Sequence, residues 1–161
     1  MAIFVGEFDQ TIDAKHRLMI PAALRERMDP DKDGREFILV RAEDGHLWLY
    51  PDVAYGAILE QLNPLKVPVL EAGKVAMLFG MARTVRPDKQ GRIVLPEKSM
   101  QRAVISDEVT LVGVLDHIEI WPRAAWEQHV EENLPVYGQV LHEAAGRLRD
   151  AAEGQDGKGT S

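Results

Sequence analysis

Aspartate and arginine occur four residues apart at two places in this chain, each time directly before a short aliphatic segment and a proline. The first pair is Asp13 and Arg17, and the second, 75 residues further on, is Asp88 and Arg92. The planar guanidinium group of arginine donates two parallel hydrogen bonds, a geometry suited to phosphate groups and to guanine. The pattern therefore marks two candidate loops for binding phosphates or bases.

Two interpretations of these loops are open. In the structural one, the aspartates accept backbone N–H bonds in a tight loop and the arginines pair with acidic neighbours. In the functional one, each loop presents a cationic edge to a ligand. The duplication favours a role shared by both loops, whether in folding or in binding. The candidate binding residues are Lys15, His16 and Arg17 in the first copy and Arg86, Lys89 and Arg92 in the second.

A second pair of segments indicates that a whole unit is duplicated. Residues 46–51 and 117–122 both begin with histidine and end with an aromatic residue before proline, 71 residues apart. Two signatures in the same order at nearly the same spacing indicate an internal repeat. The polar segment 29–36 in the first copy accounts for the difference between the two spacings, because loops tolerate insertions.

Each copy is predicted to consist mainly of strands. The aliphatic segment after each loop is typical of a buried strand, and proline suits the first position of the short helix that follows. Two further apolar segments around a turn predict a hairpin in each copy. The hairpin strands are 37–41 with 47–50 and 108–114 with 117–121, and the predicted helices are 21–28, 51–62, one from about residue 69, 122–133 and 136–145.

The repeat also predicts how the chain is organised. A unit of about 45 residues buries too little core to be stable alone, so we expect the two copies to pair. The predicted parts are a first domain over 5–54, linking helices over 55–81, a second domain over 82–125, a helical extension over 126–153 and a disordered tail over 154–161.

The composition excludes several classes of function. The chain has 161 residues, 45% of them hydrophobic, as expected of a folded protein. It has no cysteine, which excludes disulfides, cysteine-ligated zinc and a thiol nucleophile. Its histidines show no metal-binding spacing, and its serines form no nucleophile elbow. We therefore expect no catalytic residues, no metal, no other cofactor and no enzyme activity.

Neither a membrane segment nor a targeting segment is expected. The longest apolar run, residues 75–82, is far shorter than the roughly 20 residues of a membrane helix. The N-terminus lacks the basic region of a signal peptide. We expect a cytoplasmic protein that does not contact membranes.

The net charge of −7 argues against a nonspecific coat for nucleic acid. The negative charge is unevenly distributed, however. Residues 1–60 carry −5, whereas residues 61–122, which include the second loop, carry +1. Because net charge does not determine the local potential, cationic loops on an acidic chain remain compatible with DNA binding.

Taken together, the tandem Asp-x-x-x-Arg-aliphatic-Pro units and their hairpins resemble the MraZ family of bacterial transcriptional regulators, over roughly residues 3–130. The resemblance implies an α+β, β-rich fold in which two SpoVT-AbrB repeats form an AbrB-like barrel of the double-psi or swapped-hairpin type, with short helices and a C-terminal helical extension. It also implies a nucleoid-associated, sequence-specific DNA-binding regulator of the division and cell-wall gene cluster. A ring-shaped homo-oligomer would bind repeated boxes on double-stranded DNA, including its own promoter.

The resemblance assigns roles at the motif. The arginines contact DNA, and Asp13 and Asp88 structure the loops. Lys15 matches the usual lysine of the first loop. His16 stands where the family commonly has glycine, as at Gly91 in the second copy. Residues other than glycine are costly where φ is positive, so the first loop is expected to differ from the second in geometry or affinity.

Two alternatives remain open. An AbrB-type antitoxin would bind DNA and also cap a toxin through its C-terminal segment, but the helices predicted over residues 123–152 disfavour a toxin-wrapping tail. A toxin gene next to this one would favour it. The other alternative is a non-catalytic assembly module in which the arginines only fasten their loops. Such an oligomer would not bind DNA even at low salt.

Overall fold

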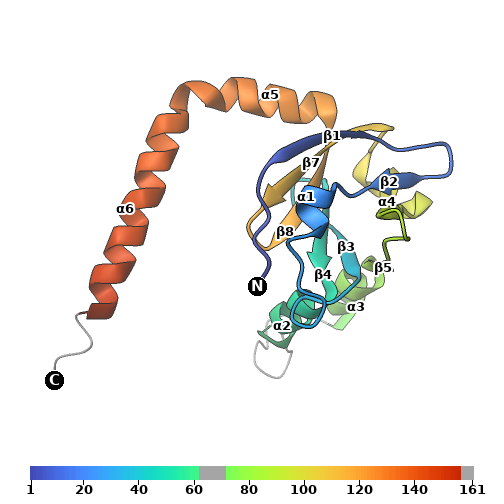
Figure 1. The fold of residues 1–161 in the computed structure, drawn as a ribbon, viewed down its shortest axis with the longest axis horizontal. Coiled ribbons are helices and arrows are strands. Elements are labelled where there is room, and N and C mark those ends of the chain that lie inside the picture. Colours follow the sequence, from blue (N-terminus) through green and yellow to red (C-terminus); the bar gives the residue numbers. More distant parts are fainter. Residues whose placement is uncertain (62–71, 157–161) are drawn as a thin grey trace. The chain divides into compact units, whose positions relative to one another are not determined.

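The computed structural model describes residues 1–61 and 72–156 (Figure 1). The chain divides into two compact units, Met1–Ala124 and Ala125–Ser161. All strands of the described residues lie in the first unit, which contains both copies of the repeat. The first residues of the helix predicted from about residue 69 lie outside the described residues.

The order of elements follows the repeat. The first copy contains the strands β1 (Glu7–Thr11), β2 (Arg17–Met19), β3 (Phe37–Arg41) and β4 (Leu47–Pro51) and the helices α1 (Ala22–Arg25) and α2 (Asp52–Gln61). After α3 (Ala72–Gly80), the second copy contains β5 (Arg83–Val85), β6 (Arg92–Val94), α4 (Glu97–Ala103), β7 (Glu108–Val114) and β8 (His117–Pro122). The chain continues with α5 (Arg123–Asn133), the 3-10 turn η1 (Leu134–Val136) and α6 (Tyr137–Asp156).

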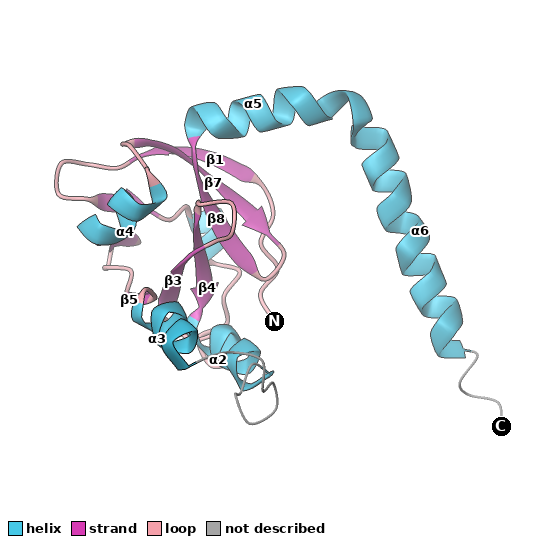
Figure 2. Cartoon of the chain, turned by 180° about the vertical axis from the view of Figure 1, so that it is seen from behind, coloured by secondary structure: helices cyan, strands magenta, loops and turns pink. Residues whose placement is uncertain are grey.

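Six strands form an antiparallel sheet in the order β1-β7-β8-β4-β3-β5 (Figure 2). Strand β2 pairs with β6 in a separate ribbon. Both predicted hairpins, β3–β4 and β7–β8, are confirmed. The two copies exchange strands, because β1 pairs with β7 of the second copy and β5 pairs with β3 of the first. Each copy therefore completes the sheet of the other.

Strand register shows that the two copies are related by an approximate twofold axis. In the ribbon, Leu18 lies opposite its repeat equivalent Ile93. Where the hairpins meet in the sheet, Trp48 lies opposite its repeat equivalent Glu119. An axis through both pairs would exchange the copies, as a duplicated sequence that pairs with itself requires.

The core lies between the sheet and the ribbon. Side chains alternate across a strand, so every second residue can face the core. Leu18 and Ile93 of the ribbon and Leu49 and Ile120 of the sheet all have 0% exposure. Full burial of such a side chain stabilises the fold by about 1.5–3 kcal/mol. The ribbon that carries both loops is therefore anchored by its apolar face.

The α+β class with short helices and a C-terminal helix is confirmed, whereas a closed barrel is not found among the described strands. The six-stranded sheet ends at β1 on one side and β5 on the other, and the ribbon is not hydrogen-bonded into it as a ladder. Barrel closure therefore stays a prediction.

Several helix boundaries differ from those predicted. The helix predicted over 21–28 ends at Arg25, because the N–H groups of Arg27 and Met28 bond three residues back, as in a 3-10 turn. Pro51 and Pro122 end strands rather than begin helices, so α2 and α5 start one residue later.

The last helix is longer than predicted, whereas α5 ends at the predicted residue. Pro135 lies in the 3-10 turn that separates α5 from α6, since proline cannot continue a helix ladder. Helix α6 continues to Asp156, into the segment 154–161 for which disorder was predicted. The rest of that segment lies outside the described residues. Within the described ranges, no helix has the length and apolar content needed to cross a membrane.

Candidate nucleic-acid interface

The first loop is organised by the carboxylate of Asp13. Its Oδ1 accepts hydrogen bonds from the backbone N–H groups of Lys15, at 2.9 Å, and Arg17, at 2.8 Å. Its Oδ2 accepts a bond of 2.6 Å from Nε of Arg17. The loop is closed by the backbone bond from His16 N to the Asp13 carbonyl, at 3.0 Å. One side chain thus fixes both the loop and the arginine.

The second loop repeats this arrangement. Oδ1 of Asp88 accepts bonds from the N–H groups of Gln90, at 2.8 Å, and Arg92, at 3.0 Å, and Oδ2 accepts a 3.0 Å bond from Nε of Arg92. Gly91 has φ +85°, and its equivalent His16 has φ +60°. The histidine therefore adopts the left-handed conformation that glycine adopts in the second copy, so the two loops share their backbone geometry.

Hydrogen bonding keeps both carboxylates charged. The pKa of Asp13 is lowered, first by the backbone N–H of Arg17 and also by its guanidinium group. The pKa of Asp88 is lowered in the same way by Arg92. The aspartates make the contacts that the structural interpretation describes, with backbone N–H groups and with the arginines. These contacts use only part of the hydrogen-bonding capacity of the arginines. Within the described part of the chain only their Nε atoms are bonded, so the Nη groups remain for another acceptor.

The ribbon brings the two arginines onto one surface. Arg17 lies opposite Val94, and Arg92 lies opposite Met19, so the arginines are diagonal neighbours across the two strands. Diagonal neighbours are separated by about 7–8 Å. In each strand, the residue that directly follows the arginine is buried in the core. Because side chains alternate across a strand, both arginines lie on the outer face of the ribbon.

Of the remaining predicted cations, the two lysines are unpaired in the described residues and Arg86 has an acidic partner. Lys15 and Lys89 are exposed beside the two arginines. Arg86 is 70% exposed and forms a 2.9 Å ion pair with Glu36, which belongs to the polar insertion of the first copy. Exposed ion pairs of this kind contribute about 0–1 kcal/mol, so Arg86 can exchange this partner for another anion.

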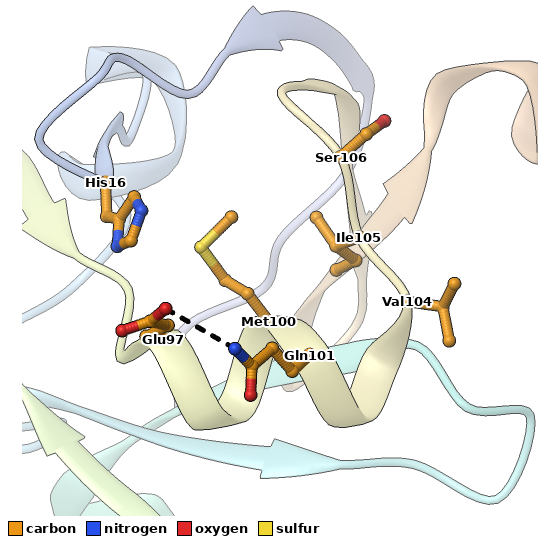
Figure 3. Close-up of a pocket in the computed structure, with 7 residues that line it drawn as sticks. All are labelled: His16, Glu97, Met100, Gln101, Val104, Ile105 and Ser106. Atoms are coloured by element: carbon orange, nitrogen blue, oxygen red, sulfur yellow. Dashed lines mark hydrogen bonds between the residues drawn. The ribbon is translucent and has the colours of Figure 1, made fainter.

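His16 borders a groove that the sequence did not indicate. The groove has a volume of about 490 Å³ and lies along α4 (Figure 3). Glu97 and Gln101 are hydrogen-bonded to each other in it, at 3.4 Å. The other residues that line it are Met100, Val104, Ile105 and Ser106. The first loop therefore has an open, partly acidic neighbour.

The repeated histidines form part of an aromatic cluster on the sheet. The ring of His117 stacks on Trp48, with centroids 4.3 Å apart, and His46 lies 4.1 Å from Trp121. His117 is 7% exposed and bonds to Asp116, at 2.8 Å, and to the carboxylate of Glu119, at 3.2 Å. A structural role for both histidines follows from this packing. Among the described residues, no group of three acidic or histidine side chains could hold a metal ion.

Comparison with known proteins finds a family whose model covers both copies of the repeat. A family model described as "MraZ protein, putative antitoxin-like" matches residues 3–69 and 78–136. A "Transcriptional regulator MraZ" of Clostridium tetani is 33% identical over 139 residues, which cover 86% of this chain and 94% of the relative. Proteins of the same name from Pediococcus pentosaceus and Moorella thermoacetica are 36% and 35% identical, over 81% and 84% of this chain and 88% and 92% of theirs.

These matches confirm the resemblance found in the sequence. They support the expectation that the chain is not an enzyme, because the relatives are named as regulators of transcription. The family model ends at residue 136, so α6 lies beyond it. Both Asp-x-x-x-Arg loops and both hairpins lie within the matched residues. The chain belongs to the MraZ family.

Proposed function

We propose that this protein is a transcriptional regulator that binds specific sites on double-stranded DNA through its two Asp-x-x-x-Arg loops. The observation that carries the proposal is the pair of preordered loops whose arginines share the outer face of one ribbon and keep their Nη groups available. The names of the relatives support a role in transcription.

The loops suit the chemistry of DNA. A guanidinium group can donate two bonds to a phosphate or to the O6 and N7 atoms of guanine. Because the aspartates hold Nε of Arg17 and Arg92, these side chains lose little conformational entropy on binding. Lys15 and Lys89 add exposed charges for the phosphate backbone, which would position the loops without reading sequence.

A ring-shaped homo-oligomer would compensate for the small number of contacts per chain. Linking several loop pairs raises their effective concentration and can strengthen binding by about 10²- to 10⁴-fold. The matching target is a series of repeated boxes upstream of the protein's own gene, within the division and cell-wall cluster. The exchange of strands between the copies supports an AbrB-like barrel of the swapped-hairpin type as the unit of this ring. The protein would act in the cytoplasm, at the nucleoid.

The antitoxin alternative has less support. It requires a C-terminal segment that wraps a toxin, whereas residues 123–156 form α5, η1 and α6. A second protein that copurified with the chain at fixed stoichiometry, and whose toxicity the chain suppressed, would favour this alternative.

Gel-shift titration with DNA from upstream of the gene tests the proposal. Arg17→Ala combined with Arg92→Ala should weaken binding by about 100-fold or more, since each bond to a charged group contributes about 1.5–3 kcal/mol. Arg147→Ala combined with Arg149→Ala, at two exposed positions of α6, is the charge-matched control and should bind as the unchanged protein does. Binding should also fall steeply with salt, because phosphate contacts release counterions. Undiminished binding by the double variant would refute the assigned role.

A further inference from the structure

The second loop is covered by an arginine from the other copy. Arg25 of α1 lies over Gly91, and its Nε donates a 2.7 Å hydrogen bond to the carbonyl of Ile20. A Cβ atom placed on Gly91 would lie 2.9 Å from Cδ of Arg25 and still closer to Nε and Cζ. Gly91 is accordingly buried, although it belongs to a surface loop. The guanidinium group occupies the space that a side chain at position 91 would need.

The first loop lacks this cover. Arg25 follows Pro21 by four residues, and its repeat equivalent, four residues after Pro96, is Met100. Met100 lines the open groove beside His16, and Glu97 lines it as well (Figure 3). The two loops therefore share a backbone but differ in charge at their edges.

This difference gives the second loop an additional cation. Within the described residues, only Nε of Arg25 is hydrogen-bonded, so its Nη groups remain for a further acceptor. The bond to Ile20 fixes the start of the guanidinium group beside the loop, much as Asp88 fixes Arg92. A fixed arginine among Lys89 and Arg92 suits the phosphate backbone of DNA.

We propose that Arg25 is a DNA-contacting residue of the second loop, supplied by the first copy, and that the absence of a side chain at Gly91 makes room for it. This inference rests on the proposed function. It makes the two loops unequal: the second binds phosphate with an additional arginine, and the first has His16 and an acidic, uncovered groove in its place. The chain therefore contacts a box more strongly through its second loop.

Exchanging the residues between the loops tests this. Arg25→Ala should weaken binding to the upstream DNA about tenfold and lower the slope of log Kd against log salt by about one phosphate contact. Arg25→Lys keeps the positive charge, so it should leave the salt slope unchanged and weaken binding less than Arg25→Ala does. Arg25→Met with Gly91→His gives the second loop the residues of the first and should also weaken binding. The reverse change, Met100→Arg with His16→Gly, should strengthen it several-fold.

Thermal unfolding of each variant separates binding from stability. Loss of affinity in Arg25→Ala without a change in salt slope would mean that Arg25 only supports the loop, which would overturn the inference. A gain of affinity in the Met100→Arg, His16→Gly protein supports it even if Arg25→Ala is unstable. Arg92→Ala serves as the reference. If Arg92→Ala weakens binding and Arg25→Ala does not, the inference about Arg25 fails alone; if neither does, the proposed function fails as well.

Discussion

At the scale of single residues, one carboxylate organises each loop. The two oxygens of Asp88 have separate partners, since Oδ1 accepts backbone N–H groups and Oδ2 accepts the guanidinium group of Arg92. An amide can replace the first function because its oxygen also accepts N–H bonds. It cannot replace the second, because the NH2 group that would stand in place of Oδ2 is a donor and cannot accept a bond from Nε of Arg92.

This division predicts a graded response at position 88. Asp88→Ala should weaken DNA binding by about tenfold, because the loop and its arginine both lose their fixed geometry. Asp88→Asn should weaken it only a few-fold. Asp107→Ala, at an exposed position, controls for the removal of a negative charge. Titrations by fluorescence anisotropy would measure the three constants, and equal affinities for the alanine and asparagine variants would contradict the division.

His117 predicts a dependence of stability on pH. Burial by itself would lower the pKa of His117, but hydrogen bonds to Glu119 and Asp116 outweigh it and raise the pKa. A raised pKa in the folded state contributes stability that is fully present below the ordinary histidine pKa of about 6.5 and is lost as pH rises through the folded value. The free energy of unfolding should therefore decrease as pH increases from about 6.5.

The variant His117→Gln should remove that part of the slope. Urea unfolding at several pH values between about 6 and 9 would measure it, with His142→Gln in the exposed helix α6 as control. A slope that is the same with and without His117 would assign the dependence to another group.

At the scale of elements, the polar insertion of the first copy has a structural function that its composition does not suggest. Asp33 is 3% exposed, and its carboxylate accepts bonds from the N–H groups of Ala2, at 3.1 Å, and Asp29, at 2.8 Å. It thereby ties the N-terminal segment, where Ala2 is buried, to the insertion.

Asp33→Ala should lower the free energy of unfolding by about 1–3 kcal/mol, because the buried N–H group of Ala2 and the partly buried one of Asp29 lose their acceptor. Asp31→Ala, two residues away and exposed, should change it by less than about 0.5 kcal/mol. Chemical denaturation of the pair would measure the difference. Equal stability of the two variants would show that the insertion is only a tolerated loop.

The sequence predicted elements better than their assembly. Both hairpins follow from alternating apolar residues beside turn residues, and local signals of that kind are visible along one chain. The exchange of strands between copies depends on pairing between residues about 100 positions apart for β1 with β7 and about 45 positions apart for β5 with β3, which no local pattern encodes. For the same reason the motif located Asp13 and Arg17, whereas the position of Arg25 over Gly91 became visible only in three dimensions.

At the scale of the whole molecule, strand exchange makes the two copies depend on each other. An isolated first copy, residues 1–61, would lose β7, β8 and β5 as partners of its strands and β6 as partner of β2. We expect it to be unfolded by circular dichroism. Residues 1–136, which include both copies, should unfold in a single cooperative transition. A folded isolated copy, or two separate transitions from residues 1–136, would contradict this interdependence.

The central claim is that two small cationic loops on an acidic chain bind specific DNA. The most direct measurement is a footprint on the DNA immediately upstream of the gene, with the unchanged protein and with the Arg17→Ala, Arg92→Ala variant. The account predicts protected, regularly repeated boxes that disappear in the variant while its fold persists. Protection that survives in the variant, or no protection by the unchanged protein at low salt, would contradict the account.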